Sequence, residues 1–278
     1  MVRVKRSAGA LLAGLLLALL GPGAHPAGTA GDTLKISGTG GAIGGVALVA
    51  RAFCRANPGV KVIIPRSMGS TGGIRAAIAG KLDIGLSARP LNREERDLGA
   101  RDTPYAQTPF VFAVNPGVRR SDITAPEILD IYEGRLGWWD DGTPVRLVLR
   151  PEADTDSVLL RRRIPGLAAA LAKAHGREGM LVALTDADCA DRIENTPGAF
   201  GTTTLSLVRS ENRRIKILAV SGVAPSGEAV GAGTYPYTKT FHVVTGPHPS
   251  PAALRFIEFL RSPDGMSILL QSGHLALP

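Results

Sequence analysis

The chain contains few of the residues on which stacking, disulfide or metal chemistry depends. Aromatic residues make up 5% of its 278 residues, so platforms for stacking bases or sugars are scarce. Two cysteines occur, and Cys54 lies in an apolar helical pattern that favours a free thiol over a disulfide with Cys189. The five histidines are scattered and no CxxC pair occurs, which argues against a dedicated zinc site. We expect no cofactor and no metal.

Long apolar runs are confined to the beginning of the chain. A basic start (Arg3, Lys5, Arg6) precedes an apolar run from Ala8 to Leu20, and small residues follow. This order is typical of a secretory signal peptide, and we expect residues 1–30 to be removed on export. The run is short for a membrane span.

A coherent basic face is also lacking, although the formal net charge is +8. The positive residues are dispersed except for Arg161–Arg163 and Arg213–Arg214, which we interpret as a solvated helix face and a turn. A nucleic-acid site would need clustered cations with aromatic residues between them. We therefore expect no nucleic-acid partner.

The first half of the mature chain repeats a strand, a glycine-rich loop and a helix. In the first unit, the strand Leu34–Ser37 leads into a glycine loop. In the second, Gly69–Gly73 precedes a helical pattern, and the strand Leu82–Ser87 follows that helix. Two such units place two helix N-termini at one edge of a parallel sheet, where ligands of α/β proteins bind. The hydroxyls of Ser70 and Thr71 are predicted either to cap the second helix or to cradle an anion.

Two strong strand patterns, near residues 108–115 and 238–245, bracket a block with βα character of its own. This arrangement predicts two lobes with the bracketing strands as hinge and the ligand in the cleft between them. We predict that residues 31–113 and 242–278 form lobe 1 and that residues 114–241 form lobe 2.

A polar loop follows the strand Val145–Arg150 of the second lobe and leads to a helix from about Val158. Asp156 or Ser157 is the predicted N-cap of that helix.

Two enzyme classes find little support. Gly38, Gly40 and Gly44 space like a loose dinucleotide fingerprint, but nicotinamide cofactors are not normally available to an exported protein. Ser70 is a poor candidate for a catalytic nucleophile, because it does not lie in a GxSxG motif and no histidine occurs in a matching ligand loop. We expect a binding protein without chemistry of its own.

Five short motifs occur in order along the mature chain. They are Ser37–Gly41 (SGTGG), Gly69–Gly73 (GSTGG), Gly85–Leu91 (GLSARPL), Ile131–Gly142 with its WDDG end, and Thr196–Gly201 (TPGAFG). With these motifs the chain resembles the phosphate-binding proteins of bacterial ABC importers over nearly its whole mature length. The resemblance implies the two-lobed α/β fold of type II periplasmic binding proteins, with a ligand cleft between the lobes and two hinge strands.

Some of the family's ligand-binding positions are matched in this chain and others are not. Ser70 matches the family's anion-binding serine, and Arg150 matches the arginine that pairs with phosphate. Gly41 and Ala42 fall where the family has a Thr-Phe pair, so only backbone N–H groups could bind there. Ala88 replaces the aspartate that accepts the phosphate proton.

Asp154, Thr155 and Asp156 replace the family's Ser-Gly-Thr ligand run, which puts two carboxylates where neutral donors are expected. A carboxylate about 4 Å from an anion costs on the order of 4 kcal/mol at an effective dielectric of about 20. Three interpretations stay open: one aspartate accepts the proton of a protonated phosphate, the ligand is a different molecule with hydroxyls or a positive group, or the acids cap the helix and point away. Arg89 is equally open, as surface decoration or as a new anion partner.

We therefore predict a periplasmic protein that captures phosphate or a related oxyanion for an ABC permease in the inner membrane. The predicted ligand site draws on both lobes: Gly41, Ala42, Ser70, Thr71, Arg89, Arg150, Asp154, Thr155 and Asp156. Binding of another small polar solute, and a role as a ligand sensor without transport, are the alternatives. A monomer is the default expectation.

Overall fold

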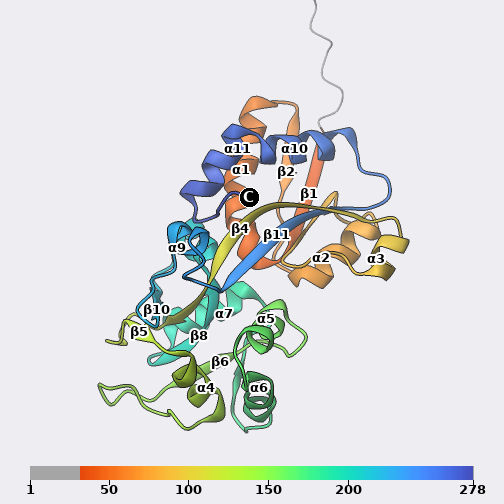
Figure 1. The fold of residues 1–278 in the computed structure, drawn as a ribbon. Coiled ribbons are helices and arrows are strands. Elements are labelled where there is room, and N and C mark those ends of the chain that lie inside the picture. Colours follow the sequence, from red (N-terminus) through yellow and green to blue (C-terminus); the bar gives the residue numbers. More distant parts are fainter. Residues whose placement is uncertain (1–31, 278) are drawn as a thin grey trace, which may run out of the picture.

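Two strands connect the two lobes of the molecule. The computed structural model describes residues 32–277, so the predicted leader lies outside the described residues. β4 (Arg101–Val114) and β11 (Thr238–Thr245) run side by side through the middle of the molecule, with one lobe at either end (Figure 1). No helix among residues 32–277 is long and apolar enough to cross a membrane.

Lobe 1 is built from both ends of the described chain. Its strands are β1 (Asp32–Gly38), β2 (Val60–Ile63) and β3 (Ile84–Ser87), and its helices are α1 (Gly40–Ala56), α2 (Gly69–Ile78), α3 (Arg93–Asp97), α10 (Pro251–Arg261) and α11 (Pro263–Gln271). β1 pairs in parallel with β2 and β3, and β11 joins β3 antiparallel. The two predicted strand–helix units are confirmed, but the glycines predicted as loops lie inside the helices, because α1 begins at Gly40 and α2 at Gly69. Both helices begin at the same edge of the sheet.

The elements between β4 and β11 form the rest of the molecule. They are β5 (Asp122–Ile123), α4 (Ala125–Glu133), β6 (Arg146–Leu149), α5 (Thr155–Arg163), α6 (Leu167–His175), β7 (Leu181–Val182), α7 (Asp186–Asn195), β8 (Ala199–Thr204), α8 (Leu205–Ser210), β9 (Lys216–Ile217), β10 (Ala219–Val220) and α9 (Gly227–Gly231). The main sheet has nine strands in the order β2–β1–β3–β11–β4–β8–β6–β7, with β9 beside β4.

Each lobe has its own large apolar core. Leu34, Phe53, Phe241 and Phe256 are buried in the core of lobe 1. Phe110, Phe112, Tyr132, Trp139 and Phe200 are buried in the core of lobe 2. Along β4 the side chains pass from the first core at Ala106 to the second at Phe110, which makes this strand part of both lobes. The predicted lobe boundaries, after residues 113 and 241, stay a prediction.

Helix starts are the main correction to the sequence-based expectations. Residues Gly69–Gly73 form the first turn of α2 rather than a loop before it, and Met68 is the N-cap without a side-chain hydrogen bond. Ser70 and Thr71 therefore do not cap this helix. α5 begins at Thr155, and its N-cap is Asp154, not Asp156 or Ser157.

A glycine near the start of α2 serves packing. Gly73 lies so close to the sheet that an added Cβ would stand 2.7 Å from the Cα of Gly38 and 3.0 Å from the carbonyl oxygen of Leu86. Both contacts are with backbone, which cannot swing aside as a side chain can. The GSTGG motif thus lets α2 rest on β1 and β3.

We expect Gly73→Ala to lower the free energy of unfolding by about 1–3 kcal/mol, because the methyl group overpacks a rigid contact. Urea unfolding monitored by circular dichroism measures this change. Gly59→Ala is the matched control, since a Cβ at Gly59 meets nothing within 4 Å. Equal stability of the two variants would contradict the packing role.

Candidate functional site

Five charged side chains meet where the two lobes join. They are Arg150, Asp154, Asp156, Asp186 and Lys239, and we call them the charge cluster. Arg150 follows β6, Asp154 and Asp156 begin α5, and Asp186 begins α7, so four of the five stand at strand or helix ends of lobe 2. Lys239 comes from the hinge strand β11. The exposed fraction is 3% for both Arg150 and Lys239, so these cations are shielded from water.

Arg150 is engaged within lobe 2. Its Nη1 donates to the carbonyl oxygen of Ala183 at 2.9 Å, and its Nη2 donates to Oδ2 of Asp154 at 2.9 Å. The other carboxylate oxygen of Asp154 accepts from the backbone N–H of Asp156 at 2.9 Å, which caps α5. Asp154 is therefore both a helix cap and the counter-ion of the arginine that the resemblance assigns to phosphate.

Lys239 is a buried cation that was not among the residues predicted for the site. Its Nζ pairs with Oδ1 of Asp156 and lies 5.2 Å from the centre of the Phe110 ring. The second oxygen of Asp156 accepts from the hydroxyl of Thr202 at 3.1 Å. A buried ion pair is tolerated when its remaining hydrogen-bonding capacity is satisfied, and here the neighbouring strand β8 supplies that bond.

Asp186 reaches from lobe 2 to the first turn of α1. Its Oδ2 accepts from the backbone N–H of Gly40 at 2.8 Å and lies 3.5 Å from the hydroxyl of Thr39. Its Oδ1 lies 4.0 Å from Nζ of Lys239. One carboxylate thus touches an N-terminal turn of lobe 1 and the buried lysine of the hinge.

The protonation of the cluster follows from burial and from its internal charges. Burial alone would raise the pKa of Asp156, but Lys239 and Arg150 outweigh it and hold this pKa below its ordinary value. Burial would lower the pKa of Lys239, but Asp156 and Asp186 raise it, so the lysine stays charged. Burial and the charge of Asp156 raise the pKa of Asp154 to about 6, against the pull of Arg150.

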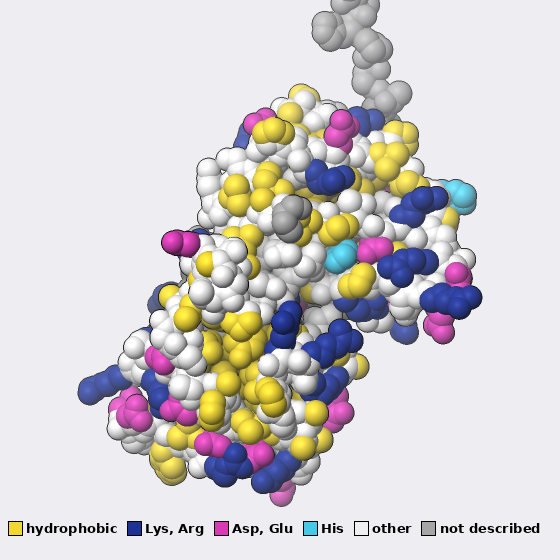
Figure 2. All heavy atoms as spheres, viewed as in Figure 1, with side chains coloured by type: hydrophobic (Ala, Val, Ile, Leu, Met, Phe, Trp, Pro, Cys, Tyr) yellow, Lys and Arg dark blue, Asp and Glu magenta, His cyan; other side chains and the backbone are white. Residues whose placement is uncertain are grey.

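A cavity of about 680 Å³ opens in front of the charge cluster, between the lobes. Its lining includes Ala88 and Arg89 from lobe 1, Thr155, Arg162 and Arg163 from α5, and Lys239 from β11. Figure 2 shows Lys and Arg side chains gathered where the two lobes meet. Of the arginines Arg161–Arg163 at the end of α5, interpreted from sequence as a solvated helix face, Arg162 and Arg163 are exposed but border this cavity.

The lobe 1 residues predicted for the site form hydrogen bonds with neighbours in their own lobe. Oγ of Ser70, which is buried, accepts from the backbone N–H of Ala88 at 2.9 Å. Arg89 forms two bonds to Glu95, at 2.8 and 2.7 Å, and its Nη2 lies 3.4 Å from the hydroxyl of Thr71. The bond to Glu95 raises the pKa of Arg89, so it remains a cation with a partner of its own.

The predicted residues therefore fall into four groups. Arg89 and Thr155 line the cavity, and Arg150, Asp154 and Asp156 belong to the charge cluster behind it. Ser70 and Thr71 support the loop that carries Arg89. Gly41 and Ala42 are buried in the first turn of α1, where the carbonyl oxygen of Gly41 accepts from the hydroxyl of Ser206 at 2.9 Å.

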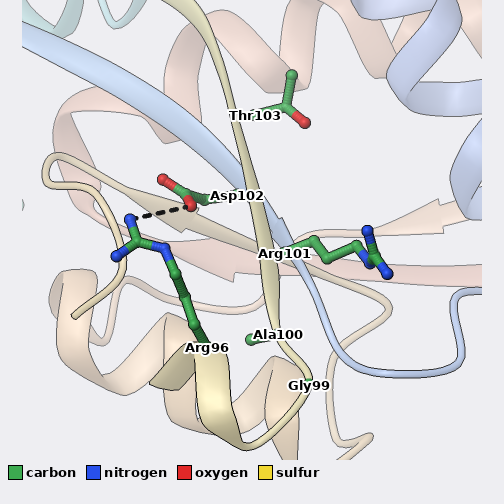
Figure 3. A pocket seen from close by; sticks show the side chains of 6 residues that line it. All are labelled: Arg96, Gly99, Ala100, Arg101, Asp102 and Thr103. Carbon is green, nitrogen blue, oxygen red and sulfur yellow. Dashed lines mark ion pairs between the residues drawn. The ribbon is translucent and has the colours of Figure 1, made fainter. Parts of the chain in front are cut away.

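A second cavity, of about 480 Å³, lies beside the start of β4 (Figure 3). The side chain of Arg96 faces Asp102 there, with Nη2 and Oδ1 3.7 Å apart, whereas Arg101 points the other way (Figure 3). Oδ2 of Asp102 also lies 2.9 Å from Nδ1 of His242. Because its facing charges already pair with one another, we assign this cavity no ligand.

The two cysteines are free, as expected. Cys54 is half-buried in α1 and Cys189 is buried in α7. Burial raises the pKa of the Cys189 thiol to about 12, so it stays protonated and inert.

Comparison with known proteins decides the family. A profile described as a PBP superfamily domain matches residues 23–264, which is most of the chain. The chain belongs to the PBP superfamily. The resemblance noted from the five motifs is thereby confirmed at the level of this superfamily.

Individual matches are distant. The chain is 26% identical over 255 residues to the phosphate-binding protein PstS of Bacillus subtilis, covering 88% of this chain and 81% of that protein. A phosphate ABC transporter substrate-binding protein with bound phosphate, from Clostridium perfringens, matches with a TM-score of 0.77 and 21% identity over 89% of this chain and 100% of its own. A reduced form of OxyR from N. meningitidis matches with a TM-score of 0.59 and 12% identity over 89% of this chain and 99% of its own.

These matches confirm the predicted two-lobed α/β fold of type II binding proteins. The relatives named above for phosphate are named as binding proteins, in agreement with the expectation that this chain is not an enzyme. A Synechocystis CcmR regulatory domain shares the fold, with a TM-score of 0.53 and 12% identity over 83% of this chain and 96% of its own, so the fold alone does not separate transport from sensing.

We expect the stability of the protein to depend on pH through Asp154. Its pKa in the folded protein, about 6, lies above the ordinary 3.8, so the folded chain holds this proton more tightly than the unfolded chain. The associated stability is fully present below the ordinary pKa and is lost as the pH rises through about 6.

Asp154→Asn, which keeps a capping oxygen, should flatten this slope. Urea unfolding of wild type and variant measures the effect at several pH values between about 4.5 and about 7, a range that spans the shifted pKa of Asp154. A variant with the wild-type slope would show that another group causes the pH dependence.

Proposed function

We propose that the chain is a periplasmic solute-binding protein that captures phosphate or a related oxyanion between its lobes and delivers it to an ABC permease in the inner membrane. The observation that carries this proposal is the cavity between the lobes, which guanidinium groups border from both sides: Arg89 from lobe 1, and Arg162 and Arg163 from lobe 2. An anion placed between them is attracted to both lobes, so its binding favours lobe closure.

The arginines of α5 are better placed than Arg89 to bind an anion. Arg89 is balanced by Glu95, whereas among residues 32–277 neither Arg162 nor Arg163 forms an ion pair. Thr155, in the first turn of the same helix, adds a hydroxyl to the cavity wall. Guanidinium groups suit oxyanions because they offer parallel N–H donors.

Arg150 supports the proposal less than the resemblance implied. Its charge is already used by Asp154, and the acids of α5 face the cluster rather than the open cavity. Of the three interpretations of Asp154 and Asp156, the geometry favours helix capping and internal pairing. The proposed oxyanion position is therefore in front of the cluster, beside Arg162 and Arg163.

A second candidate is a larger polar solute with an anionic group. A cavity of about 680 Å³ is of the size that encloses an organic molecule, and a single tetrahedral ion would fill only a small part of it. Its mixed wall, with Leu91, Val158 and Leu159 beside the arginines, offers apolar contacts that inorganic phosphate would not use.

Localisation and partner are part of the same proposal. Export rests on the predicted leader of residues 1–30, and transport rests on the names of the distant relatives. A sensor role is the alternative, supported by the shared fold of the CcmR regulatory domain. We propose a monomer in solution.

We expect ligand binding to raise the thermal stability of the mature protein. A ligand at about a hundred times its dissociation constant adds about 2.7 kcal/mol to the free energy of unfolding. Differential scanning fluorimetry with phosphate, sulfate, molybdate and a panel of organic phosphates and carboxylates would identify it. A shift with an organic anion but none with the inorganic ions would favour the second candidate.

The double variant Arg162→Ala, Arg163→Ala should lose most of that shift. Arg161→Ala is the matched control, because Arg161 lies on the same helix but borders a different hollow. An unchanged shift in the double variant would mean that the ligand binds elsewhere.

A further inference from the structure

Asp186 and the first turn of α1 form a contact between the lobes that the proposed function does not use. α7, which carries Asp186, packs with lobe 2, where Cys189 and Ile193 share a small core with Val148. α1 packs in the core of lobe 1 through Val46 and its neighbours. The bond from Gly40 N–H to Asp186 therefore joins one lobe to the other.

The start of α1 lacks a cap from its own sequence. Thr39 is the N-cap residue but makes no side-chain capping bond, and the first turn contains no acidic residue. A helix N-terminus has unpaired N–H groups and a partial positive charge, both of which favour an anion. Asp186 supplies the negative charge, at 2.8 Å from the N–H of Gly40, and the exposed fraction of Asp186 is 5%.

Gly40 is matched to this carboxylate in shape. A Cβ at Gly40 would stand 2.8 Å from Cβ and 2.9 Å from Oδ2 of Asp186, so any larger residue would displace the carboxylate. On its other side the carboxylate lies 4.0 Å from Nζ of the buried Lys239. A helix N-terminus and a buried cation, facing one space from two sides, make a favourable position for an anion.

We propose that Asp186 is a tethered anion, which fills the anion position between α1 and Lys239 and holds the lobes together without a ligand. Free phosphate cannot enter this position while the carboxylate is there, so Asp186 acts as a specificity-determining residue. If the proposed function is right, solutes are left with the outer cavity beside Arg162 and Arg163. This inference concerns a contact within the chain and does not depend on the proposed function.

The charge balance of the cluster also supports the role of Asp186 as a tethered anion. Three carboxylates, Asp154, Asp156 and Asp186, face two cations, Arg150 and Lys239. Removing the Asp186 side chain leaves two carboxylates with two cations and an empty space against the α1 N-terminus. The variant should therefore accept an anion that the wild type repels.

The test compares Asp186→Ala with Asp188→Ala in the mature protein. Asp188 lies in the same first turn of α7 but bonds to Leu184 N–H at 3.0 Å and to Arg192 at 2.9 Å, within its own lobe. Equilibrium dialysis with radiolabelled phosphate measures affinity, and small-angle X-ray scattering of the ligand-free protein measures the radius of gyration.

We expect Asp186→Ala to bind phosphate about tenfold more tightly than the wild type, because the helix N-terminus and Lys239 become accessible to the ion. Its ligand-free radius of gyration should increase, and phosphate should reduce it again. Asp188→Ala should match the wild type in both measurements. If the alanine variant does not fold, Asp186→Ser, a residue well suited to a first helical turn, provides the same comparison.

Two outcomes would overturn the proposal. If Asp186→Ala matches Asp188→Ala in affinity and in radius of gyration, Asp186 is neither a tethered anion nor a contact that holds the lobes. If the radius increases without a rise in phosphate affinity, the anion position is disproved and only the contact between the lobes is supported. A wild type that binds no oxyanion would contradict the proposed function and leave this comparison intact.

Discussion

The burial of Lys239 in the hinge constrains the rest of the site. Taking an ammonium group out of water costs several kcal/mol, and only close carboxylates with good geometry can offset that cost. Asp156 pairs with it directly and Asp186 lies 4.0 Å away, so both lobe 2 helices must begin near β11. The positions of α5 and α7 relative to the hinge are thus tied to one lysine, and with them the wall of the cleft.

Much of the fold could be predicted from the sequence because its patterns are local. The hinge strand Thr238–Thr245 was predicted with the bounds that the structure has, whereas the cap at Asp154 was predicted two or three residues too late, at Asp156 or Ser157. Helix starts are harder, because Gly, Ser and Thr suit both a loop and a first turn. At Gly73 the deciding factor is contact with Gly38 and Leu86, which lie on other strands and leave no local signal.

The site was predicted less well, since its chemistry depends on pairs far apart in the chain. Asp186 and Gly40 are brought together only by the fold, and no spacing rule connects them. Lys239 did leave a signal: in the alternation of β11 it shares the inward-facing positions with Phe241 and Val243. A lysine at an inward position predicts a buried carboxylate partner, although not which one.

The carboxylates that the chain itself places in the cleft reduce the free energy that a ligand must supply to close the lobes. In a two-state lobe movement, a ligand shifts the equilibrium only by its difference in affinity for the closed and open states. A hydrogen bond to a charged group contributes about 1.5–3 kcal/mol, so the contact between Asp186 and Gly40 alone would favour closure by roughly ten- to a hundredfold. The open state then remains populated enough for a solute to enter. In the proposed function, a solute bound by Arg162 and Arg163 would gain affinity because part of the closing free energy is already supplied within the chain.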